Sequence, residues 1–366
     1  MLTLTQNELV IVGKYFNTIQ DYINVTKTCK TYNQILKLYK TNFIPISTQQ
    51  EFELFENIET YTVYTTKDLK IDDIKTISYK QTYLSETEKN KDKDITYKHV
   101  ILNYNLNVEH LSPNTNITSI SYSCFKKCQT LKSIVLPYSI TKIGKCCFRH
   151  CKNLKTVDLN MCKYLEEIPD YCFKNCDKLE NVILPTGITR IGKYCFKNCD
   201  KLENINLDVY KNLVELGKSC FEHCVKFENI ILPTSITKLG SGCFGRCYKL
   251  QYINIPSGIK KLGSGCFNIC ERLKSIDLSM CENLVELGKS CFEYCHNLEY
   301  VKLPSSITSL GNDCFNICEK LTNINLDDVV EIGNYCFKGC EKLKNIDLNK
   351  NVYLYINCFE GCDLNY

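Results

Sequence analysis

Residues 172–192 read CFKNCDKLENVILPTGITRIG, and variants of this stretch recur along the chain. Its opening motif, Cys-Phe-x-x-Cys, occurs eleven times, with successive copies 22, 23 or 25 residues apart. Self-similarity at such a period indicates a solenoid, because one repeat cannot bury its own apolar face and must stack on neighbours. The first cysteines of the eleven copies are Cys124, Cys147, Cys172, Cys195, Cys220, Cys243, Cys266, Cys291, Cys314, Cys336 and Cys358.

The residues within one repeat predict its local structure. Leu179, Val182 and Leu184 end in the alternation that is typical of a strand with one buried face. Pro185 cannot donate to a strand ladder and should end this strand, whereas Gly192 fits a turn that needs positive φ. We expect the two cysteines of each motif on one face of a short helical turn. The eleven motif Phe side chains should stack as a spine roughly 50 Å long.

Three repeats are 25 residues long, because they lose the Pro and gain two residues. We expect these insertions to bulge in one row of loops and to leave the strand register intact. They comprise Asn160-Met161-Cys162, Asp208-Val209-Tyr210 and Ser279-Met280-Cys281.

The repeat resembles the BspA-type, or treponemal, leucine-rich repeat, whose pattern runs Ala-Phe-x-x-Cys-x-x-Leu-x-x-Ile-x-Leu-Pro-x-x-Ile-x-x-Ile-Gly. The resemblance covers about residues 95–366 and departs at the Ala position, which is Cys in all eleven copies. It implies a right-handed leucine-rich-repeat stack with a parallel β-sheet on a concave side. It also implies a binding role, since bacterial members of the family are surface proteins that bind host proteins.

Three regions are predicted along the chain. Residues 1–48 should form a small, mainly helical domain, residues 49–115 a connecting and capping region, and residues 116–366 the eleven repeats. Thr5-x-x-Glu8 is a plausible capping box, and the residues that follow at helical spacing are Leu9, Val12, Phe16 and Ile19.

Three short helices ahead of a leucine-rich solenoid resemble an F-box. That resemblance would imply docking to a Skp1-like adaptor through residues 1–46. The Leu-Pro that usually opens an F-box is replaced by Leu4-Thr5, and three amphipathic helices also match many unrelated domains.

The charge balance disfavours two classes of ligand. The 366 residues carry 45 Lys+Arg and 41 Asp+Glu, a net charge of +4. No basic tail or stripe stands out in the sequence, which argues against nucleic acid. The aliphatic run Leu9 to Val12 is too short for a signal-peptide core or a membrane span. We therefore expect the cytoplasm as the compartment, with the cell surface as the alternative.

The cysteines allow three interpretations. The chain has 26 Cys and no Ala, so Cys can stand where Ala would, as a small buried apolar residue. Disulfides would need an oxidising compartment. Zinc sites favour Cys-x-x-Cys pairs, often with His, whereas these pairs are Cys-x-x-x-Cys and only five His are present. We predict buried reduced thiols, with no metal and no cofactor.

Other motifs that could suggest chemistry have simpler explanations. Gly240, Gly242 and Gly245 form a Gly-x-Gly-x-x-Gly string, but Gly240 is the turn glycine of its own repeat, and no nucleotide fold surrounds it. The His residues are scattered, and no nucleophile elbow, phosphate loop or zinc-protease helix is present. The sequence therefore predicts a protein that is not an enzyme.

The predicted function is a non-catalytic scaffold that binds an unknown protein ligand through the concave solenoid surface. The alternatives are an F-box-type substrate receptor of a ubiquitin ligase and a BspA-like surface antigen or adhesin. Tyr is enriched at interface hot spots, so Tyr252 and Tyr300 are the expected anchors, although the same row could be only a solvated sheet face. The candidate binding residues are Asn181, Ile183, Asn204, Asn206, Asn229, Ile231, Tyr252, Asn254, Asp277, Tyr300, Lys302, Asn323 and Asn325.

Overall fold

The computed structural model describes residues 117–364 apart from 204, 345 and 349, together with a few short segments before them. These segments are four residues between 20 and 24 and the strands β1 (Thr60–Val63), β2 (Thr76–Tyr79), β3 (Thr82–Tyr83), β4 (Ile95–Tyr97) and β5 (Val100–Leu102). The predicted helical domain over 1–48 lies outside the described residues, apart from those four.

The chain divides into two compact units, and the first contains the strands β1 to β5. Strands β1, β2 and β4 form a parallel sheet in which Thr60 lies opposite Thr76 and Ile77 opposite Ile95. Strand β3 pairs with β5, also in parallel. Parallel neighbours joined by crossover connections are what stacked repeats produce. The interpretation of residues 49–115 as a capping region with degenerate repeats stays a prediction.

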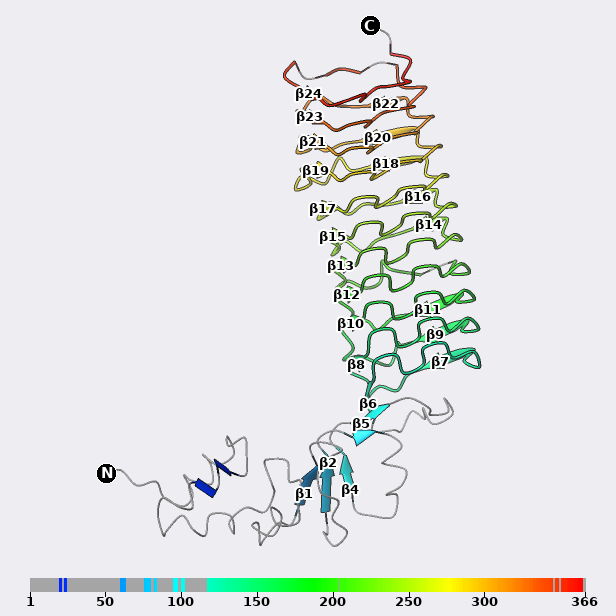
Figure 1. Cartoon of the computed structure of the whole chain (residues 1–366), viewed down its shortest axis with the longest axis vertical. Helices are drawn as coiled ribbons and strands as arrows, with labels where there is room; N and C mark the ends of the chain where they lie inside the picture. The colour runs from blue at the N-terminus through cyan, green and yellow to red at the C-terminus, as the bar shows by residue number, and fades with distance from the viewer. Residues whose placement is uncertain are drawn as a thin grey trace, which may run out of the picture. The chain divides into compact units, whose positions relative to one another are not determined.

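The second unit is a solenoid built from two rows of short parallel strands (Figure 1). β6 (Ile117–Ile120) precedes it. The first strand row is formed by the Leu-x-x-Ile-x-Leu segments. Its members are β7 (Ser133–Val135), β9 (Thr156–Asp158), β11 (Asn181–Ile183), β14 (Asn229–Ile230), β16 (Tyr252–Ile253), β18 (Ser275–Asp277), β20 (Tyr300–Lys302) and β22 (Asn323–Ile324).

The second strand row was not predicted. It is formed by the Ile-x-x-Ile-Gly segments, and from β10 to β24 it is a continuous nine-stranded sheet, whereas the first row is divided into three shorter sheets. Its members are β8 (Lys142–Ile143), β10 (Glu167–Ile168), β12 (Arg190–Ile191), β13 (Glu215–Leu216), β15 (Lys238–Leu239), β17 (Lys261–Leu262), β19 (Glu286–Leu287), β21 (Ser309–Leu310), β23 (Glu331–Ile332) and β24 (Tyr353–Leu354).

The prediction that the repeat glycine adopts positive φ in a turn is wrong. Gly192 does not have positive φ. A Cβ atom placed on it would lie 2.5 Å from the backbone nitrogen of Asp170 in the preceding rung. The glycine is therefore needed because the backbones of successive rungs approach closely where the second strand row ends.

The expected helical turn at Cys-Phe-x-x-Cys is also wrong. Tyr194 and Asn198, the residues directly before the two motif cysteines, both have positive φ (56° and 57°). The Phe196 amide donates to the Cys220 carbonyl of the next rung (2.8 Å), whereas the Cys199 amide closes a turn on the Phe196 carbonyl (3.2 Å). A helix would direct these amides along its own axis, so the stack replaces it with a bend that binds its neighbour.

The predicted phenylalanine spine, comprising the eleven motif Phe side chains from Phe125 to Phe359, is confirmed. Successive rings are stacked with centroids 5.2 to 5.7 Å apart. The rings from Phe148 to Phe315 are fully buried. Around the spine, the inward Leu, Ile and Val side chains of both strand rows complete the core.

The first and third insertions keep the register of the first strand row, as predicted, whereas no strand of this row is described around the second. Around the first insertion, Asn181 still lies opposite Thr156 and Ile183 opposite Asp158. The last residue of each three-residue insertion stretch does not bulge outward, however. Cys162, Tyr210 and Cys281 are buried, and the Tyr210 hydroxyl accepts the Leu184 amide (3.0 Å).

Candidate protein-binding surface

The first strand row presents alternate side chains to solvent, because its inward residues fill the core. Tyr252 and Tyr300 are 50% and 56% exposed, and Ile183 and Ile231 are 49% and 55% exposed. The pairing of β14 with β16 and of β18 with β20 places Asn229 opposite Tyr252 and Ser275 opposite Tyr300. Large exposed apolar and aromatic side chains therefore project from the same face of the stack.

Most of the remaining predicted residues of this face are also exposed to solvent. Asn181, Asn206, Asn229 and Asn323 are exposed, as are Asp277, Lys302 and Asn325. Asn204 lies outside the described residues.

Some predicted binding residues already have partners within the solenoid. The Asn254 side chain is partly buried, accepts the Leu232 amide (2.6 Å) and donates to the Leu232 carbonyl (3.2 Å), so it substitutes for a backbone pairing. Asp277 accepts the Ser279 hydroxyl (2.6 Å) and forms an ion pair with Lys302 (3.4 Å). These side chains stabilise the surface itself, which leaves the exposed Tyr and Ile residues as the candidate contacts for a partner.

The outer face of the second strand row is occupied by ion pairs between rungs. Arg190 contacts Glu167 (2.5 Å) and lies 3.8 Å from Glu215, which also pairs with Lys238 (3.0 Å). Exposed pairs of this kind contribute little to stability. They do neutralise the charges on this face, so it offers a partner fewer unpaired side chains than the first strand row does.

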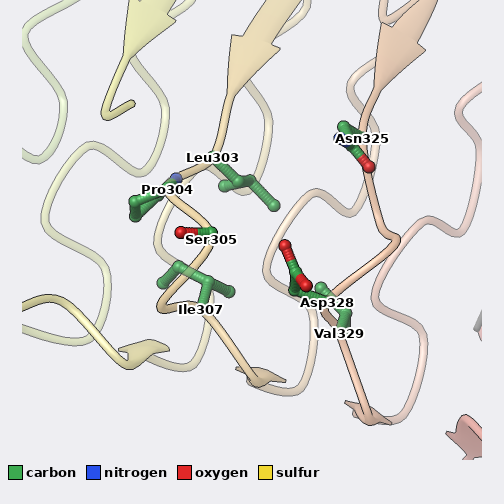
Figure 2. Close-up of a pocket in the computed structure, with 7 residues that line it drawn as sticks. All are labelled: Leu303, Pro304, Ser305, Ile307, Asn325, Asp328 and Val329. Atoms are coloured by element: carbon green, nitrogen blue, oxygen red, sulfur yellow. The ribbon is translucent and has the colours of Figure 1, made fainter. Parts of the chain in front are cut away.

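A hollow of about 200 Å³ opens beside the end of the first strand row, next to β20 and β22. Its accessible lining is mainly polar, because the residues Pro304, Ile307 and Val329 are buried. Figure 2 shows the Asp328 side chain beside the turn of the preceding rung. The lining residues are Leu303, Pro304, Ser305, Ile307, Asn325, Asp328 and Val329.

The hollow lies where a repeat of ordinary length meets a shorter one, since the repeat from Cys314 to Cys336 has one residue fewer than the 23-residue repeats. The turn of the shorter repeat is closed by the Val329 amide donating to the Leu326 carbonyl (3.0 Å), whereas in the preceding rung the Ile307 amide donates to the Pro304 carbonyl (3.1 Å). The 22-residue spacing was visible in the sequence, but spacing alone does not tell which side of the rung lost the residue.

The motif cysteines form two buried rows. All described cysteines are free. The second cysteine of a motif donates its thiol to the spine Phe carbonyl of the preceding rung, as Cys151 does to Phe125 (2.9 Å) and Cys224 to Phe196 (3.3 Å). Burial raises the pKa of Cys151 and Cys291 from 9.0 to about 12, so these thiols stay neutral and poorly nucleophilic.

The remaining candidates for chemistry are a metal site and the other motifs singled out in the sequence. Among the residues that the structure describes, no three His, Cys, Asp or Glu side chains are placed to hold a metal ion. His223 and His296 contact Asp200 (3.2 Å) and Glu319 (3.0 Å) at the surface. Gly242 has positive φ within its motif, and a Cβ on Gly240 would collide with the preceding rung. Both glycines therefore serve the repeat.

The protein-family model of the BspA type leucine rich repeat region matches residues 99–209, 166–281 and 277–366 of this chain, in six copies. The chain belongs to the BspA-type leucine-rich repeat family. Members of this solenoid family are generally non-enzymatic scaffolds. Among the described residues, no catalytic group of side chains is seen. Within the described part of the chain, no helix has the length and apolarity to cross a membrane.

Solved structures of other leucine-rich repeat proteins resemble this BspA-type chain. A leucine-rich repeat protein from Bacteroides ovatus is 26% identical, with a TM-score of 0.61, over 84% of this chain and 77% of that one. The pneumococcal vaccine antigen PcpA is 20% identical, with a TM-score of 0.47, over 84% of each chain. No curated protein sequence matches the chain.

Proposed function

We propose that this BspA-type protein is a non-catalytic scaffold that binds a folded partner protein along the first strand row of its solenoid. The observation that carries the proposal is the exposed series of Ile183, Ile231, Tyr252 and Tyr300 on one face. Aromatic side chains that are half exposed can be fully desolvated by a partner and often dominate binding energy. The second strand row, by contrast, is neutralised by its own ion pairs.

The hollow beside β22 is the proposed specificity pocket of this surface. The half-buried Leu303 side chain offers an apolar wall, and the exposed carboxylate of Asp328 stands at the rim. A Lys or Arg side chain suits this combination, because its aliphatic stem packs on apolar surface while its tip seeks a carboxylate. We expect the partner to insert such a side chain here.

The test begins with affinity capture by the full chain and identification of the partner by mass spectrometry. The double variant Tyr252→Ala/Tyr300→Ala should weaken the affinity for that partner by about 30-fold or more, since hot-spot truncations cost about 2 kcal/mol. Asp328→Asn should weaken it by a smaller factor.

The matched control is Tyr122→Ala/Tyr164→Ala, which removes two exposed tyrosines from elsewhere on the solenoid. This control should bind as the unaltered chain does, as should Lys193→Ala. A partner that binds the Tyr252→Ala/Tyr300→Ala variant undiminished would place the interface on another surface.

The compartment is part of the proposal. A solenoid interior of free thiols is best preserved in a reducing environment, which supports the cytoplasm. Family membership supports the second candidate, a surface adhesin, and labelling of intact cells with an impermeant reagent distinguishes the two. The F-box hypothesis rests on residues outside the described part of the chain. A Skp1-like adaptor among the captured proteins would support it.

A further inference from the structure

A basic residue follows the spine phenylalanine in four successive rungs, from Lys126 onward. Three of these side chains contact tyrosine rings: Arg149, Lys174 and Lys197. The spine rings beside them are 5.2 Å and 5.3 Å apart, from Phe148 to Phe173 and from Phe173 to Phe196. The three cations, which we call the basic row, are therefore held at about one rung's spacing.

Two tyrosines hold the basic row in place. Tyr171 and Tyr194 stack with ring centroids 4.9 Å apart. The Lys174 ammonium lies 5.6 Å from the Tyr171 centroid and 5.5 Å from the Tyr194 centroid. The Arg149 guanidinium lies over Tyr171 (5.7 Å), and the Lys197 ammonium over Tyr194 (5.7 Å). Attraction between cations and ring faces thus orders three side chains that would otherwise be flexible.

The positive charge of this cluster is only partly compensated. Lys197 pairs with Glu222 (2.7 Å). Among the described residues, no carboxylate lies within ion-pair distance of Arg149 or Lys174, and the Arg149 Nε atom is buried without a hydrogen-bond acceptor. Burial, and next the charges of Arg149 and Lys197, lower the pKa of Lys174. Burial and then Arg149 likewise lower the pKa of His150.

We propose that the basic row of Arg149, Lys174 and Lys197 is a second binding surface, and that it takes an extended acidic segment of another protein. Successive side chains on one face of an extended strand are about 6.7 Å apart, which long basic side chains at a rung's spacing can follow. The Arg149 guanidinium, which no described carboxylate pairs, would gain such a partner, because guanidinium and carboxylate form paired hydrogen bonds. This proposal is independent of the first strand row.

The aromatic residues favour a peptide over a single-stranded nucleic acid. Nucleic acids bind such surfaces by stacking bases on exposed aromatic faces. Here Tyr171 lies between Arg149 and Tyr194, and Tyr194 between Tyr171 and the Lys218 ammonium (6.0 Å). Both ring faces are therefore covered, and the cluster recognises charge without stacking.

The probe is a fluorescein-labelled octaglutamate peptide, measured by fluorescence anisotropy against the full chain at low ionic strength. We expect binding that weakens with added salt. The triple variant Arg149→Gln/Lys174→Gln/Lys197→Gln should bind at least tenfold more weakly. Glutamine keeps part of the aliphatic stem over the tyrosine rings, and an unchanged urea midpoint would establish that the variant is folded.

The matched control is Lys226→Gln/Lys261→Gln/Lys289→Gln, which removes the same charge from lysines that already pair with Glu203, Glu286 and Asp313. It should bind within twofold of the unaltered chain. An equal loss in this control would overturn the site in favour of net charge. A second variant, Arg149→Lys/Lys174→Arg/Lys197→Arg, keeps the charges and should keep binding.

Octaglutamine and the oligonucleotide (dT)8 complete the experiment. Octaglutamine should not bind. Equal affinity for (dT)8, lost in the same triple variant, would overturn the choice of an acidic protein segment and assign the row to nucleic acid. Octaglutamate binding that the triple variant leaves unchanged would overturn the proposal altogether.

Discussion

Replacing one ring of the phenylalanine spine tests whether the rungs stabilise one another through it. Phe221 is fully buried, and its ring lies 5.3 Å from Phe196 and 5.6 Å from Phe244. A third ring, Phe227, contacts it at an angle of 54°. Phe221→Ala therefore removes contacts with the rungs on both sides as well as within its own rung.

The expected magnitude follows from these contacts. Truncating a fully buried Phe to Ala costs about 3–5 kcal/mol, because apolar burial is lost and a cavity remains. Two stacked neighbours place Phe221→Ala in the upper part of that range. Phe359 in the last rung is only half buried and stacks on Phe337 alone (5.3 Å). Phe359→Ala should therefore cost about half as much.

The assay is equilibrium unfolding in urea, followed by circular dichroism, with the midpoints of both variants compared with that of the unaltered chain. Repeat arrays can unfold in steps. The first loss of signal is therefore compared as well as the midpoint. Phe267→Ala serves as a second interior variant and should match Phe221→Ala. Equal midpoints for the interior and terminal variants would refute the stacked spine as a source of stability.

The remaining predictions concern the cysteines. Cys220→Ala should change the free energy of unfolding by less than about 1 kcal/mol, because little volume is lost. Cys224→Ala should cost about 1 kcal/mol more, since it removes the hydrogen bond to Phe196; equal urea midpoints would contradict this. The burial that raises the pKa of thiols such as Cys151 and Cys291 from 9.0 to about 12 also predicts a pH dependence. Below pH 9 both states are protonated, and above it only the unfolded thiols ionise. Stability should then fall by up to about 1.4 kcal/mol per such thiol and pH unit until pH 12, and equal midpoints at pH 8 and pH 10 would refute it. Alkylation of the denatured, unreduced protein should label 26 thiols, and paired oxidation or bound zinc would overturn the reduced state.

Much of the solenoid was predictable because its core residues recur in every repeat. The Leu-x-x-Ile-x-Leu alternation predicted the first strand row, and the invariant Phe predicted the spine. The second strand row was missed because Gly192 was interpreted as a turn residue with positive φ. Its actual constraint, a backbone 2.5 Å from where a Cβ would lie, comes from a rung that is 22 residues away in sequence at Asp170.

The candidate surfaces were less predictable than the core. The outward residues of the first strand row followed from the strand alternation, and Tyr252 and Tyr300 are exposed as expected. That Asn254 substitutes for a backbone pairing of Leu232 could not be deduced, because it depends on the distance between two rungs. The basic row was overlooked for the same reason. Its cations are more than 20 residues apart in the sequence, so no basic stripe is visible there.

Burial of one apolar face imposes a periodic pattern on every rung, so the repeats, their inward-facing residues and their family can all be recognised in the amino-acid sequence. The folded structure was needed to see what the stacked rungs place side by side. It joined Arg149, Lys174 and Lys197 into one charged row, opened a hollow over Pro304 and directed each second motif thiol to a neighbouring carbonyl. These features depend on contacts between rungs, and a periodic pattern specifies that rungs stack without specifying which variable side chains then meet.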